Sequence, residues 1–105
     1  MEMKIKWLAT AIEDINNVCD FLALKSPSAA SNLYDCILDA AEELLIFPEA
    51  GQIEAFLEDC PECFRYLVIK KHYKMIYVIN EDYIEIVDIW DCRRNPSSLK
   101  RFIGK

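Results

Sequence analysis

Two cysteines three positions apart, Cys60 and Cys63, are the residues whose spacing most directly suggests chemistry. The arrangement Cys-Pro-Glu-Cys is similar to redox pairs and to halves of zinc sites. A zinc site needs a second pair or several histidines, and the only histidine is His72. A redox pair is expected at the start of a helix, whereas this one leads into a predicted strand. The five cysteines and the absence of an export signal therefore predict reduced thiols in a cytoplasmic protein, with no metal and no cofactor.

Charge is divided unevenly along the chain. The net charge is −6, but residues 1–63 carry −10 and residues 64–105 carry +4. This division suits a protein that shows one basic face to an acidic or anionic partner, with a solvated charge distribution as the alternative.

The basic half has the pattern of a β-meander. Aromatic and β-branched residues fill 64–69, 73–80 and 83–91, and short polar breaks separate these runs. The third run ends at an Arg-Arg-Asn-Pro corner, where Pro96 forces the chain to turn. We therefore predict three antiparallel strands followed by a basic segment.

The acidic half begins with a strand and a helix. Residues 4–8 alternate apolar and basic side chains, as in a strand. Thr10 and Glu13 fit a capping box at the start of a helix that ends near Lys25.

A second helix follows directly. Ser26 predicts its N-cap, Pro27 suits the first helical position, and the Phe-Pro pair at 47–48 ends it. Two amphipathic helices joined by so short a break form an antiparallel hairpin. Residues 49–61 are expected to form a loop, in which acidic side chains such as Glu54 are solvated.

The predicted elements specify a single α+β domain over residues 1–105. Its four-stranded sheet combines the N-terminal strand with the meander, and the helical hairpin covers one face. The N-terminal strand is expected at an edge or beside the last strand. At 105 residues and 53% hydrophobic content the chain can bury a core, and it contains neither a signal peptide nor a transmembrane run.

Together these features resemble the RelE/ParE toxin superfamily. The resemblance covers residues 4 to about 99 and rests on the Ser-Pro-Ser-Ala-Ala turn between the helices, the stop at 47–51, Arg65, Tyr73, Tyr77 and the corner at 91–96. Members of that superfamily are small bacterial cytoplasmic toxins, as in plasmid stabilisation systems, and an antitoxin neutralises them by direct binding. The resemblance implies a cognate antitoxin bound along the helical hairpin and sheet edge, in a toxin–antitoxin hetero-oligomer.

RelE-like members cut mRNA on the ribosome without a metal, which requires cations around the developing negative charge and groups that move protons. By similarity, Arg65, Lys74 and Arg93 would be the catalytic cations. Leu67 and Leu99 stand where such nucleases have proton-transferring side chains. His72 could move protons, since its ordinary pKa is about 6.5, but its Lys-Lys-His surroundings are typical of a solvated turn.

ParE-like members instead bind and inhibit DNA gyrase. Leu67 and Leu99 place this chain closer to them, and the tail with Phe102 and Ile103 suits a protein contact. We therefore expect a ParE-like toxin that acts by binding rather than as an enzyme. The alternatives are a ribosome-dependent endoribonuclease and an inactive, toxin-derived binding module.

Overall fold

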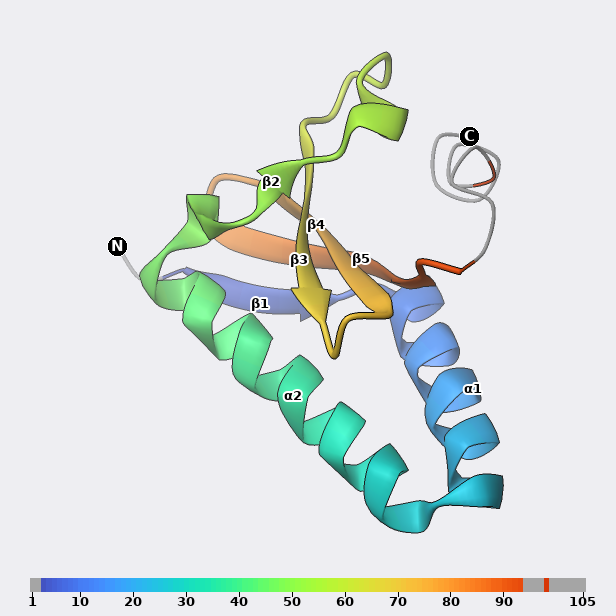
Figure 1. Ribbon diagram of the computed structural model, residues 1–105. Helices are drawn as coiled ribbons and strands as arrows, with labels where there is room; N and C mark the ends of the chain where they lie inside the picture. The colour runs from blue at the N-terminus through green and yellow to red at the C-terminus, as the bar shows by residue number, and fades with distance from the viewer. Residues whose placement is uncertain (1–2, 94–97, 99–105) are drawn as a thin grey trace.

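The structure is a computed structural model that describes residues 3–93 and residue 98. The elements, in chain order, are β1 (Lys4–Trp7), α1 (Ala9–Lys25), α2 (Pro27–Ile46), η1 (Pro48–Ala50), β2 (Gln52–Ile53), η2 (Ala55–Leu57), β3 (Phe64–Ile69), β4 (Tyr73–Ile79) and β5 (Tyr83–Asp91), where η marks a short 3₁₀ helix. The two helices lie on one side of the sheet and meet at the turn around Ser26 (Figure 1). In the described part, neither helix is both long and apolar enough to cross a membrane.

The sheet has five strands in the order β1-β5-β4-β3-β2. β1 runs parallel to β5, with Lys4 opposite Tyr83, and the other neighbours are antiparallel. The predicted place of the N-terminal strand beside the last strand is therefore confirmed. The predicted count of four strands was too low, because β2 is only two residues long and pairs with Arg65 and Tyr66 across the sheet rather than showing a pattern of its own.

Local sequence signals account for the start of α2 but not for the start of α1. Ser26 Oγ accepts a hydrogen bond from the Ala29 backbone N–H at 3.2 Å, and Pro27 occupies the first helical turn, as predicted. The capping box predicted at Thr10 is wrong: Leu8 is the N-cap and makes no side-chain cap. The Thr10 hydroxyl instead donates to the Val87 carbonyl at 3.0 Å and joins the helix to β5.

Both faces of the sheet are covered, by different parts of the chain. The helices bury one face in the main core, whose helical members include Ile15, Leu33, Ile37 and Leu44. The other face carries a second apolar cluster formed by Leu57, Phe64, Ile76, Val78 and Trp90. Leu57 comes from η2, so part of the segment expected to be a surface loop closes this second core.

A buried tyrosine fixes the chain where α2 passes into β2. The Tyr77 hydroxyl donates to the Pro48 carbonyl at 2.7 Å and accepts from the Gly51 N–H at 2.9 Å, and the side chain is fully buried. A Cβ at position 51 would lie 2.6 Å from the Tyr77 hydroxyl oxygen and 2.7 Å from the Tyr66 carbonyl oxygen. Glycine is therefore required at position 51 by the close approach of its neighbours.

Tyr77→Phe should lower the free energy of unfolding by about 1–3 kcal/mol, because the buried Gly51 N–H and the partly buried Pro48 carbonyl would lose their partner. Burial is the main cause that raises the pKa of Tyr77 above its ordinary value of 10.0. The contribution of this hydroxyl is fully present below about pH 10 and is lost as the pH rises through the folded-state pKa. Urea unfolding across the alkaline range should show wild-type stability falling more steeply than that of Tyr77→Phe. Tyr83→Phe, at an exposed position, is the control, and parallel curves for wild type and Tyr77→Phe would contradict this role.

Candidate functional site

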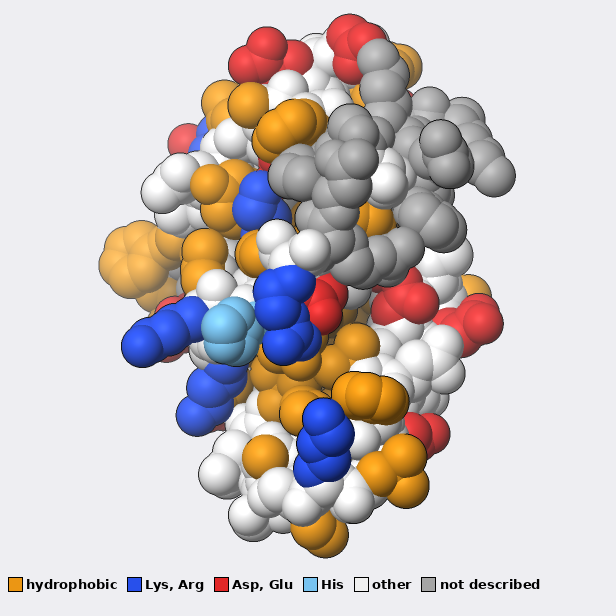
Figure 2. All heavy atoms as spheres, turned by 45° about the vertical axis from the view of Figure 1, so that its right-hand side comes forward, with side chains coloured by type: hydrophobic (Ala, Val, Ile, Leu, Met, Phe, Trp, Pro, Cys, Tyr) orange, Lys and Arg blue, Asp and Glu red, His pale blue; other side chains and the backbone are white. Residues whose placement is uncertain are grey.

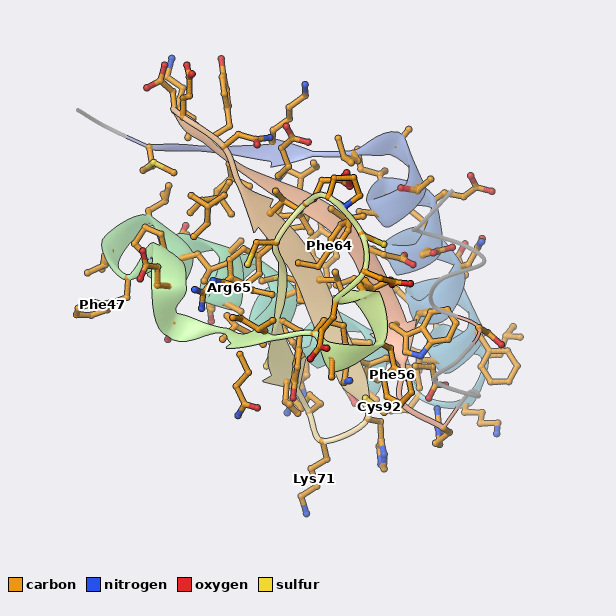
Figure 3. All side chains as sticks on the ribbon, turned by 90° about the horizontal axis from the view of Figure 1, so that it is seen from above. Phe47, Phe56, Phe64, Arg65, Lys71 and Cys92 are labelled. Atoms are coloured by element: carbon orange, nitrogen blue, oxygen red, sulfur yellow. The ribbon has the colours of Figure 1, made fainter. Side chains whose placement is uncertain are left out.

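Arg65 lies on β3 and is bound to the backbone of the neighbouring segment. Its side chain is half-buried, and Nη1 donates to the Gly51 carbonyl at 2.9 Å and to the Glu49 carbonyl at 3.4 Å. Figure 3 shows Arg65 beside the η1–β2 segment. These contacts hold the entry to β2 against the sheet and engage one of the two terminal nitrogens of the guanidinium.

Lys74, on β4, is paired with a buried carboxylate. Its Nζ lies 2.8 Å from Glu54 Oε2 and 4.3 Å from the centre of the Tyr66 ring. The Glu54 side chain is only 1% exposed, and its other oxygen accepts from the Phe56 N–H at 3.3 Å. The expectation that Glu54 is solvated is therefore wrong, because η2 folds over the sheet and takes this carboxylate out of water.

Arg93 is exposed just beyond the end of β5 and forms a two-point pair with Asp91. Nε and Nη2 donate to the two carboxylate oxygens at 2.9 and 2.8 Å, and the Arg93 backbone N–H adds a third hydrogen bond. The hydrogen bond from the Arg93 side chain is the main cause that lowers the pKa of Asp91 below its ordinary value, and the nearby His72 contributes. The carboxylate therefore stays ionised and holds the guanidinium at neutral pH.

The three cations do not converge on one point. Arg65 is opposite Tyr77, and Lys74 is opposite Val68, so alternation along the strands places Arg65 and Lys74 on opposite faces of the sheet. Arg93 lies at the end of the sheet where Ile69, Tyr73 and Asp91 pair, about 13 Å along the strands from Arg65. Joint catalysis by these three residues stays a prediction from the resemblance, and the geometry does not bring them together.

The remaining predicted positions are placed as follows. Leu67 is half-buried and packs against the main core, and His72 is exposed in the turn between β3 and β4. Cys60 is half-buried and Cys63 is exposed, and both are free thiols. No group of three or more metal-binding side chains occurs among residues 3–93 and 98. Leu99, Phe102 and Ile103 lie outside the described residues.

A groove that the sequence did not predict runs beside β1, between the two helices. It has a volume of about 270 Å³ and is lined mainly by apolar side chains: Trp7, Ile12, Ile15, Asn16, Tyr34, Ile37 and Leu38. Ile12 and Tyr34 are 48% and 46% exposed although both belong to the apolar stripes of their helices. The signal available in the sequence was that the apolar stripes of the two helices include more side chains than the sheet covers. The groove borders an edge of the sheet, since β1 is the outermost of the described strands on that side and pairs with β5.

Comparison with known proteins places this arrangement among described families. The family model described as ParE toxin of type II toxin-antitoxin system, parDE, matches residues 5–96. No sequence match was found among curated proteins. Among solved structures, a chain of a chromosomal ParDE TA system from P. aeruginosa superposes with a TM-score of 0.67 at 20% identity, covering 86% of this chain and 96% of that chain. At this identity the superposition shows a shared fold.

Proposed function

This chain belongs to the family of ParE toxins of type II toxin–antitoxin systems, and from that membership we propose that it arrests growth by binding DNA gyrase. The observation that carries the choice of binding over hydrolysis is the placement of the three candidate cations. Arg65 and Lys74 lie on opposite faces of the sheet, and Arg93 lies beyond the end of β5, about 13 Å along the strands from Arg65. Each is engaged by a carbonyl or a carboxylate of this chain. A transition state that spreads negative charge over one phosphate needs donors aimed at one point.

The apolar groove beside β1 supports an antitoxin as the second partner. Family membership implies a toxin encoded with its inhibitor, and the groove offers an amphipathic helix the exposed side chains of Ile12 on α1 and of Tyr34 and Leu38, one turn apart on α2. The outer edge of β1 could at the same time accept an extended segment as an added strand. We propose that the antitoxin covers this groove and edge.

Expression of this chain alone in a bacterium should arrest growth, and co-expression of the cognate antitoxin should relieve the arrest. The purified protein should inhibit supercoiling by gyrase and leave mRNA intact in a translating extract. Arg93→Gln should inhibit gyrase as well as wild type does. In a nuclease, loss of a cation that stabilises the transition state would cost roughly 100-fold to 1000-fold in rate.

Three results would contradict parts of this proposal in distinguishable ways. Site-specific mRNA cuts that disappear with Arg93→Gln, with supercoiling untouched, would establish the ribosome-dependent endoribonuclease. Normal growth at a verified high level of soluble protein would leave the inactive binding module. Hydrogen exchange in the toxin–antitoxin complex should show protection of β1 and both helices, and protection confined to residues 49–61 would exclude the proposed antitoxin site.

A further inference from the structure

The turn between β3 and β4 holds two lysines in a backbone conformation that lysine disfavours. Lys70 and Lys71 have φ values of 52° and 67° and are the two non-glycine residues with positive φ in the described part of the chain. Side chains with a Cβ are strained in this region, whereas Asn and Gly occupy it readily and are usual in hairpin turns. The lysines are therefore not explained by the geometry of the turn, and such strain is found preferentially at functional sites.

The two ammonium groups are available to a partner. Lys70 and Lys71 are both exposed, and neither takes part in an ion pair within residues 3–93 and 98. Lys71 projects away from the body of the molecule (Figure 3). The neighbouring Arg93 is already held by Asp91. Among the described residues, the positive charge at this end of the sheet that has no ion-pair partner therefore comes from the two turn lysines.

A hollow with an apolar lining lies directly beside these charges. It has a volume of about 280 Å³ and is formed where the helical hairpin approaches the turn. Leu22, Ala29, Leu33 and Tyr73 contribute apolar surface, and the polar part of the lining comes from Asn32, Lys70, His72 and Arg93. Figure 2 shows Lys and Arg side chains gathered around the single histidine, next to hydrophobic side chains. Its lining residues differ from those of the groove beside β1, so the two hollows are separate surfaces.

We propose that this hollow and the turn lysines bind an acidic peptide segment of a partner protein. Carboxylates of the segment would pair with Lys70 and Lys71, and an adjacent leucine-like side chain would enter the hollow. A peptide fits better than a nucleic acid for two reasons. A phosphate backbone has no aliphatic side chain for an apolar hollow, and the net charge of −6 repels an extended polyanion. This inference does not depend on gyrase as the target.

The test measures fluorescence anisotropy with a short labelled peptide in which leucine is flanked by aspartates. Wild type should bind it, and replacement of the leucine by serine should weaken binding. Lys70→Gln with Lys71→Gln should weaken binding roughly tenfold, the sum expected for two exposed ion pairs. Asn32→Asp, at an exposed position on the lining, should weaken it too. Lys4→Gln with Lys6→Gln changes the net charge equally, on the edge strand β1 that β5 separates from β4, and should have no effect.

A second variant separates binding from folding. Lys70→Asn with Lys71→Gly relieves the strained backbone and removes both charges, so its melting temperature should rise while its affinity for the peptide falls. The same anisotropy assay with a labelled single-stranded oligonucleotide tests whether the site binds nucleic acid instead of a peptide. The proposal is overturned if the peptide does not bind, if wild type and the turn variants bind it equally, or if the oligonucleotide binds more tightly through the same lysines.

Discussion

Lys74→Ala should lower the free energy of unfolding by about 3–5 kcal/mol, because it leaves the Glu54 carboxylate buried without its cation. The carboxylate would keep one hydrogen bond, from the Phe56 N–H, and would lose the partner that offsets its removal from water. Urea unfolding at neutral pH measures the loss directly.

The matched control removes both charges at once. Glu54→Leu combined with Lys74→Met should be much closer to wild type than Lys74→Ala, since apolar replacement of a buried pair is often neutral or stabilising. Equal losses in the single and double variants would show that the pair itself, rather than the orphaned carboxylate, sets the cost. The double variant is also the better test of function, because it removes the Lys74 cation and is expected to keep the fold. A toxicity assay with it asks whether the positive charge is needed for activity. Lys74→Ala alone cannot answer this, because a loss of activity could come from lost stability.

Trp90→Ala should also lower the free energy of unfolding by about 3–5 kcal/mol, the usual range for a large buried aromatic side chain. Trp90 is 2% exposed and packs in the second apolar cluster with Leu57, Phe64 and Ile76, on the sheet face opposite α1 and α2. The variant would leave a cavity in this cluster, which the short η2 segment closes through Leu57 in the described part of the chain.

The control for this prediction is Val68→Ala on β3, a position that is 60% exposed and should change stability by about 0.5 kcal/mol or less. Thermal or urea unfolding of both variants gives the comparison. A loss below about 1 kcal/mol for Trp90→Ala would mean that the second cluster does not close in solution.

Elements with local signals could be predicted from the sequence, and contacts between distant segments could not. Ser26 and Pro27 carry the chemistry of a helix start in their own side chains, so the boundary of α2 was predictable. Thr10 also looked like a capping residue in the sequence, but its hydroxyl donates a hydrogen bond to the Val87 carbonyl on β5 instead. From the local sequence Glu54 looks like an ordinary solvated loop residue. Its partner Lys74 is 20 positions away on β4, and no residue near position 54 indicates that pairing.

The separation of the candidate cations was, in contrast, open to prediction. A three-residue turn between Ile69 and Tyr73 fixes the pairing of β3 with β4, and strand alternation then decides which side chains share a face. With that register, Arg65 and Lys74 fall on opposite faces whatever the rest of the molecule does. The family resemblance identified each candidate cation separately, and the strand register is what shows that Arg65 and Lys74 do not share a site.

The parallel pairing of β1 with β5 also determines when this domain can be completed during synthesis. About 80 residues separate Lys4 from its partner Tyr83, so at cellular rates of elongation roughly 4 to 16 s pass between the two. The last of the described strands to leave the ribosome, β5, is an interior one, with β1 on one side and β4 on the other. A nascent chain interrupted before Tyr83 therefore has an N-terminal strand with no neighbour and a β4 exposed along one edge. For a toxin this order of synthesis is protective, since the sheet cannot close until β5 has been translated.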